Sequence, residues 1–177
     1  MLTGLARERG AVLVAHERLP HRAVLVRSAL RGYGPPATVV CGDGIRPSWR
    51  PGTFDRVIVD APCSGLGALR RRPESRWRRT PDDVATLVPL QRELLGSALD
   101  ATRAGGVVAY VTCSPHHEET RGVVDAVLAG RHDVVEEDAR TLLPAVTDLG
   151  DGPHLQLWPH RHGTDAMFLA LLRKGAP

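Results

Sequence analysis

The chain has 177 residues, of which 42% are hydrophobic and 24% charged, and its net charge is +3. This size and composition fit one soluble globular domain, and no apolar run is long enough for a transmembrane segment. The opening residues, MLTGLARERG, lack the apolar segment of a secretory signal. Three cysteines without disulfide or zinc spacing predict a cytoplasmic protein without a bound metal.

Short apolar runs alternate with helical patterns along the chain. Such alternation is typical of an α/β fold, in which helices connect strands of a parallel sheet and cover both of its faces. Residues 131–160 give the weakest pattern. In chain order we expect a strand at 11–17, a helix at 20–32, strands at 37–43 and 54–62, a helix from 80, a strand at 106–113, a helix at 116–130, a short strand at 133–137 and a last strand at 166–174.

The helix that starts near residue 80 carries the clearest local signals. Thr80 precedes Pro81, which suits a first helical position, and Asp83 follows the cap by three residues. This arrangement is close to a capping box, with its acidic groups at the positive end of the helix. Pro89 lies within the same pattern and is expected to bend or divide the helix.

Three acidic residues follow predicted strands, where ligands of parallel sheets bind. Glu17 could accept hydrogen bonds from a ribose, although a solvated strand-end acid is the simpler interpretation of this residue alone. Asp43 lies between two glycines in VVCGDG, which suits either close ligand approach or an ordinary turn. Asp60 ends the run FDRVIVD; burial there would raise the pKa of its carboxyl, whereas the alternative is a turn aspartate.

Two of the three cysteines also follow predicted strands. Cys63 lies in VDAPCSGLG and Cys113 in YVTCSP, just before a helical segment. A helix N-terminus lowers a thiol pKa and favours the nucleophilic thiolate. A buried, inert cysteine is the more common alternative for either residue alone, and we expect Cys41 to be such a core residue. Because Cys63 is close to Asp60 in sequence, the pair favours a functional interpretation.

The segment 70–79, RRRPESRWRR, is strongly basic and contains one tryptophan. Arginine matches phosphate groups and tryptophan can stack on a base, so the segment predicts contact with nucleic acid. The alternative is a solvated basic loop with a buried Trp77. The candidate RNA-binding residues are Arg70, Arg71, Arg72, Arg76, Trp77, Arg78 and Arg79.

With these elements placed, the chain resembles the Sun/Fmu family of S-adenosylmethionine-dependent RNA cytosine-C5 methyltransferases. The matching segments are DAPCSGLGALRRRPESRWRR, YVTCSPHHEE, VVCGDG and LWPHRHGTDAMFLALLRK. The resemblance implies a Rossmann-like class I methyltransferase sheet, S-adenosylmethionine as cofactor and RNA, ordinarily 16S rRNA in bacteria, as partner.

The resemblance also assigns roles to individual residues. It implies that Cys113 is the nucleophile that adds to C6 of cytosine, that Cys63 acts in release, and that Asp60 assists at N3 and borders the cofactor. Glu17 matches the family's acid at the cofactor ribose, Asp43 its contact near the adenine, and Arg22 an arginine that often follows the first acid.

The chain departs from the family at its beginning. Family members carry a strand and a glycine-rich turn, resembling CAGPGGK, before the region matched by MLTGLARERG. We therefore expect residues 1–177 to form a single partial catalytic domain that lacks the first strand and the glycine-rich loop. A catalytically inactive RNA-binding fragment is the alternative function, and a thiol-redox protein that uses Cys63 and Cys113 is a weaker one.

Overall fold

The computed structural model describes residues 2–33 and 37–175. They form two compact units, Met1–Ser48 and Trp49–Pro177, which are described separately. None of the helices in the described ranges is long and apolar enough to cross a membrane. The prediction that residues 1–177 form one domain stays a prediction.

The first unit contains a pair of parallel strands, as the sequence predicted. Strand β1 pairs with β2 in a register that places Glu17 opposite Cys41. Helix α2 connects them and begins with Pro20, which needs no N–H partner in the first helical turn. The elements are α1 (Leu2–Glu8), β1 (Leu13–Glu17), α2 (Pro20–Leu30), the 3-10 turn η1 (Arg31–Tyr33) and β2 (Ala37–Cys41).

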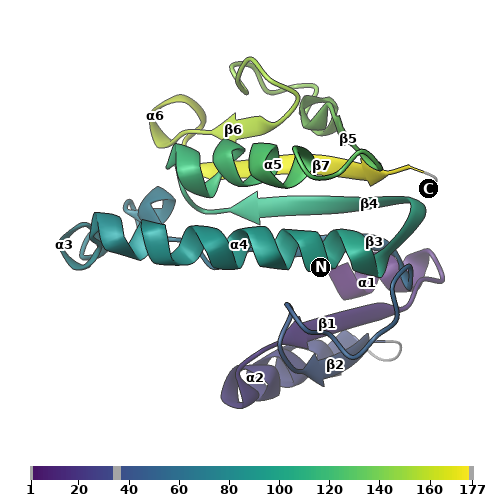
Figure 1. Ribbon diagram of the computed structural model, residues 1–177. Helices are drawn as coiled ribbons and strands as arrows, with labels where there is room; N and C mark the ends of the chain where they lie inside the picture. Colours follow the sequence, from purple (N-terminus) through teal and green to yellow (C-terminus); the bar gives the residue numbers. More distant parts are fainter. Residues whose placement is uncertain (1, 34–36, 176–177) are drawn as a thin grey trace. The chain divides into compact units, whose positions relative to one another are not determined.

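The second unit is built on a mixed sheet with the strand order β3-β4-β7-β5, and β6 pairs with β7 (Figure 1). Strands β3 and β4 are parallel, whereas β7 runs antiparallel to its three partners. The strands are β3 (Phe54–Asp60), β4 (Thr102–Thr112), β5 (Val134–Glu137), β6 (Leu155–Leu157) and β7 (Met167–Lys174). The helices and 3-10 turns are η2 (Leu66–Ala68), α3 (Ser75–Arg78), α4 (Pro81–Ala101), η3 (His117–Glu119), α5 (Arg121–Leu128), η4 (Ala139–Leu142) and α6 (Pro159–His162).

The main core lies between the sheet and the helices α4 and α5, which share one face of it (Figure 1). Leu95 and Leu99 of α4 pack with Val108 of β4, and all three side chains are fully buried. On β7, Phe168 and Leu172 point into the same core because alternate residues of a strand share a face. Apolar burial on this face is the main stabilising contribution to the unit.

Within residues 131–160, which gave the weakest sequence pattern, residues 139–157 contribute to a small core on the opposite face of β7. There Leu169 and Leu171 pack against a small core whose centre is formed by Ala139, Leu149 and Leu155. The segment contains few regular elements, so its apolar residues show no sustained helical or strand period. The predicted short strand at 133–137 is present as β5, and β6 was not predicted.

Helix α4 keeps the predicted Thr80–Asp83 cap, in which the Thr80 N–H donates to Asp83 Oδ2 at 2.8 Å. The sequence predicted that Pro89 would bend or divide this helix; the helix is undivided, and the bend stays a prediction. Buried residues on both sides of this proline, such as Val88 and Leu95, belong to one core and hold the helix together. Strand β3 is not buried on both faces, since Ile58 is 54% exposed.

Candidate functional site

The centre of the candidate site is a pair of thiols in the second unit. Strands β3 and β4 run parallel with Asp60 opposite Val111, so the segments that follow them leave the same edge of the sheet. Cys63 lies in the first of these segments and Cys113 in the second. Their Sγ atoms are 3.4 Å apart and both thiols are free. The two cysteines that the sequence placed after predicted strands are therefore neighbours in the structure.

The pKa values of the two thiols are shifted in opposite directions. A hydrogen bond from Cys63 lowers the pKa of Cys113 to about 7, although burial and the nearby carboxylate of Asp60 oppose this effect. The same hydrogen bond, together with burial, raises the pKa of Cys63 far above that of an ordinary thiol. Near pH 7 a large fraction of Cys113 is therefore thiolate, and Cys63, which stays protonated, is the thiol that donates to it.

Asp60 ends β3 as predicted but is exposed, so the expected buried carboxyl is wrong. The physical reason is the alternation along β3, which turns Ile58 and Asp60 outward together while Val57 and Val59 are partly buried. Asp60 nevertheless lies close enough for its charge to act on the Cys113 thiol.

A buried carboxylate, Glu119 in η3, joins the two cysteine segments. It accepts hydrogen bonds from the Ser64 N–H at 2.7 Å and the Ser64 hydroxyl at 2.5 Å. The Ser114 hydroxyl donates to it at 2.6 Å. Gln91 of α4 also donates to Glu119, at 3.1 Å. The residue that follows each cysteine is therefore held by the same side chain.

Gly67 packs directly against the backbone of the Cys113 segment. Its N–H donates to the carbonyl oxygen of Cys113 at 2.9 Å, and its own carbonyl accepts from Ala166 at 2.9 Å. A Cβ at this position would lie 2.1 Å from the Ala166 oxygen. Gly67 is thus needed for close backbone packing within the unit, whereas Gly65 has a φ of 73°, which favours glycine.

The basic segment 70–79 divides into two parts. Arg70 donates to the Gly163 carbonyl and Arg71 pairs with Asp165, so these two arginines fasten the segment to the loop before β7. Trp77 is 80% exposed, which excludes the alternative of a buried tryptophan, and the Arg76 guanidinium lies 4.8 Å from its ring centre. The other arginines are exposed: Arg72, Arg78 and Arg79, the last in a 3.6 Å ion pair with Asp83.

The candidate cofactor residues of the first unit lie at the carboxyl edge of its two strands. Glu17 ends β1, where it accepts from the Leu19 N–H at 2.9 Å and pairs with Arg22 at 3.7 Å. Asp43 follows β2 and accepts from the Ile45 N–H at 3.0 Å, as a turn aspartate does. Cys41 is exposed rather than buried, so the expectation of a core cysteine is wrong.

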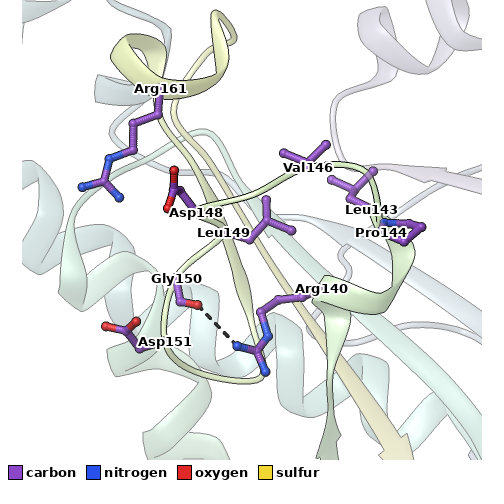
Figure 2. Close-up of a pocket in the computed structure, with 9 residues that line it drawn as sticks. All are labelled: Arg140, Leu143, Pro144, Val146, Asp148, Leu149, Gly150, Asp151 and Arg161. Atoms are coloured by element: carbon purple, nitrogen blue, oxygen red, sulfur yellow. Dashed lines mark hydrogen bonds between the residues drawn. The ribbon is translucent and has the colours of Figure 1, made fainter.

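A surface cavity of about 520 Å³ lies elsewhere in the second unit, beside the small core of residues 139–157. Figure 2 shows Arg140 and Arg161 at its wall, with Arg140 donating to the Gly150 carbonyl at 3.4 Å. Its lining includes none of the candidate site residues. Among the residues that the structure describes, no group of three His, Cys, Asp or Glu side chains could hold a metal ion.

Sequence reasoning missed Glu119, Gln91 and Asp165. An acid at the start of a helix ordinarily interacts with water and the helix dipole, so Glu119 gave no signal of burial. The one available signal was the repeated Cys-Ser dipeptide, at 63–64 and 113–114, which suggests that the serines share a partner.

The sequence of the chain is similar to those of known methyltransferases. The protein named "Putative methyltransferase Rv1407" in Mycobacterium tuberculosis (strain ATCC 25618 / H37Rv) is 57% identical over 98% of the chain and 37% of its own length. The ribosomal RNA small subunit methyltransferase B of Sodalis glossinidius is 38% identical over 86% of the chain and 34% of its own length. The chain thus spans about a third of the length of the curated relatives that it matches.

The structural comparison agrees. The crystal structure of PH0851 superposes with a TM-score of 0.85 at 27% identity, covering 93% of the chain and 37% of PH0851. This likeness confirms the predicted Rossmann-like α/β fold. The family model of the 16S rRNA methyltransferase RsmB/F matches residues 1–173. The chain therefore belongs to the RsmB/F family of 16S rRNA methyltransferases, as its resemblance to the Sun/Fmu enzymes predicted.

Proposed function

We propose that the chain carries the catalytic residues of an RNA cytosine-C5 methyltransferase that uses S-adenosylmethionine and acts on 16S rRNA. The observation that carries the proposal is the pair of Cys113 and Cys63, in which a thiolate and a thiol lie 3.4 Å apart. The name of the Sodalis glossinidius relative supports the choice of ribosomal RNA as substrate.

Cys113 acts as the nucleophile in this proposal. C5 of cytosine is a poor nucleophile, and the reaction needs a bond from the Cys113 sulfur to C6 to activate it. As that bond forms, the π electrons of the ring shift toward N3, which takes up a proton, and C5 becomes an enamine carbon. The lowered pKa of Cys113 supplies the thiolate near neutral pH.

Asp60 and Cys63 serve the proton movements. We assign Asp60 to N3 of the ring, to which it passes a proton from solvent as C6 is attacked and from which it returns that proton on release, because it is exposed at the end of β3 and lies near the Cys113 thiol. Release requires transfer of the C5 proton to a base, which we assign to solvent water, and cleavage of the C6–S bond, which returns the electron pair to the Cys113 sulfur. We assign Cys63 to this step because its thiol donates to that same sulfur and stabilises it as a leaving group.

The residues of the first unit fit the nucleoside portion of the cofactor. Glu17 and Asp43 are acceptors, which suits hydroxyl and amino groups, and the single turn bond that each makes does not exhaust a carboxylate. Arg22 holds Glu17 by an ion pair. When bound, S-adenosylmethionine supplies an electrophilic methyl group for C5.

The exposed part of the basic segment serves RNA binding. A target cytosine must leave its stack to reach a thiolate, and the flanking strand must be held while it does so. Trp77 offers an exposed face for stacking, and Arg72, Arg76 and Arg78 offer positive charge for phosphates.

Transfer of tritium-labelled methyl groups to unmodified 16S rRNA tests the proposal. Cys113→Ala should abolish transfer, whereas Cys63→Ala should accumulate a covalent RNA adduct that survives denaturing gel electrophoresis. Cys41→Ala, in an exposed position of the first unit, is the matched control and should behave as the parent chain. Undiminished transfer by Cys113→Ala would contradict the proposed mechanism.

An RNA-binding fragment without activity is the second candidate. It is favoured by one fact, that the chain spans about a third of its curated relatives. Calorimetric titration with S-adenosylmethionine separates the candidates, because the fragment should bind RNA without binding the cofactor or turning over.

A further inference from the structure

We propose that Glu119 is a positioning residue that holds the Cys63 and Cys113 segments together and thereby sets the contact between their thiols. This inference deepens the proposed function and rests on it for its catalytic meaning. The sequence position of Glu119 predicts no role for it, and its carboxylate bonds to Ser64, Ser114 and Gln91 rather than to either sulfur.

The carboxylate of Glu119 has all of its hydrogen-bonding positions occupied. Its side chain is fully buried, and each carboxylate oxygen accepts two hydrogen bonds. Oε1 accepts from the Ser64 N–H and the Gln91 amide, and Oε2 accepts from the hydroxyls of Ser64 and Ser114. A carboxylate with four donors has one defined orientation, so it is a rigid point between the two segments.

Two of the residues that donate to Glu119 directly follow the two cysteines in the chain. Ser64 directly follows Cys63, and both its N–H and its hydroxyl donate to Glu119. Ser114 directly follows Cys113, and its hydroxyl also accepts from the His116 N–H at 3.0 Å. A change in either serine moves the neighbouring cysteine, because the two share a peptide bond. Glu119 therefore controls both sulfur positions through one residue on each side.

Glu119 is itself anchored to two further elements. Gln91 of α4 donates to Glu119 and also to the Pro62 carbonyl at 2.9 Å, on the other side of Cys63. Tyr110 of β4 donates its hydroxyl to the Glu119 carbonyl at 2.9 Å. Both side chains are fully buried. The carboxylate thus relates the cysteines to the helix and the sheet rather than to each other alone.

The chemistry of the contact argues against a purely structural role. All four donors are neutral, and burying a carboxylate among neutral groups is seldom the most stable solution for a core. Its negative charge adds to the hydrogen bond and burial that raise the pKa of Cys63. A protonated Cys63 is the donor that the Cys113 thiolate needs. Position and charge of Glu119 therefore act on the same thiol pair.

The test uses thiol chemistry on the full chain. Glu119→Gln removes the charge at nearly constant shape, Glu119→Asp keeps the charge but shortens its reach, and Glu118→Gln, at the exposed neighbour, is the control. Peptide mass spectrometry follows alkylation of Cys113 by iodoacetamide against pH, and the rate at which diamide oxidises Cys63 and Cys113 to a disulfide reports their proximity.

In the parent chain and the control, Cys113 should react with a midpoint near pH 7. Glu119→Gln places an amide NH2 group against two of the four donors, so the two segments should separate and the hydrogen bond from Cys63 should weaken. This midpoint should then move toward the ordinary thiol value of about 8.5. Glu119→Asp should slow disulfide formation about tenfold, because small losses of alignment have large effects on rate. If both folded variants match the parent in midpoint and oxidation rate, the proposal is wrong.

A further pair of variants covers the case in which substitution of Glu119 prevents folding. Ser114→Ala removes one donor to Oε2, and Ser64→Ala leaves the N–H bond in place. The double variant should show the same slower oxidation, and an unchanged rate would again contradict the proposal. None of these readouts requires methyl transfer, so a failure of the proposed function leaves the test of Glu119 intact.

Discussion

Gly67 occupies a position without room for a side chain, and Gly67→Ala is the sharpest test of how the thiol site is held. A Cβ built there lies 2.1 Å from the Ala166 oxygen and 2.8 Å from the carbonyl carbon and oxygen of Cys113. All of these atoms belong to backbone, so no side chain can rotate away. The substitution must therefore push apart the two segments that Gly67 joins.

The structure gives the size of the effect. Overpacking of a well-packed site costs about 1–3 kcal/mol. Separation would also weaken the two backbone hydrogen bonds of Gly67, to Cys113 and from Ala166, each worth about 1 kcal/mol. We expect the free energy of unfolding to fall by about 3 kcal/mol and the pKa of Cys113 to rise, since its segment moves relative to Cys63.

Urea unfolding and the pH profile of Cys113 alkylation measure the two effects. Gly96→Ala is the matched control: Gly96 lies within α4, and a Cβ there meets nothing within 4 Å. That variant should gain about 0.5–1 kcal/mol, because alanine is the better helix former. The reasoning is refuted if Gly67→Ala keeps both the stability and the Cys113 profile of the parent chain.

Three further predictions concern single side chains. Cys63→Ala removes the donor to the Cys113 thiolate, so the alkylation midpoint of Cys113 should rise from about pH 7 by roughly one unit or more. An unchanged midpoint would show that Cys63 does not lower the pKa of Cys113. Trp77→Ala should weaken binding of single-stranded RNA by about 1–3 kcal/mol in fluorescence anisotropy without changing the melting temperature, because Trp77 is exposed. Arg71→Gln removes a positive charge that interacts with the Cys113 thiolate and leaves the Asp165 charge unneutralised, so the apparent pKa of the Cys113 thiol should rise; a profile like that of the parent would show that these exposed charges do not influence the thiol.

The proximity of Cys63 and Cys113 was predictable because it follows from the direction and order of the strands. Parallel neighbours such as β3 and β4 end at one edge, so two cysteines just past their ends must approach each other. The direction in which a side chain points at a strand end was not predictable. Asp60 is exposed rather than buried, and so is Cys41, because the pattern of a strand fixes alternation but not which face is covered.

Glu119 and the segment 131–160 escaped prediction for a different reason. The hydrogen bonds of Glu119 come from Ser64 and Gln91, 55 and 28 residues earlier in the chain, and no local pattern encodes such partners. Residues 131–160 pack through isolated apolar side chains such as Leu149 and Leu155, whose spacing follows neither the helical nor the strand period. Contacts made at long range set both features.

Cys63 and Cys113 are 50 positions apart in the sequence, which has a consequence for the chain during its synthesis. The increased acidity of the Cys113 thiol depends on Cys63, which only the paired strands β3 and β4 bring near. Before Cys113 has emerged and β4 has paired with β3, each thiol is an ordinary cysteine that is mostly protonated near neutral pH. Nucleophilic power is thus acquired at the end of folding, and a nascent or misfolded chain is spared the reactivity toward oxidants and electrophiles that the native chain carries.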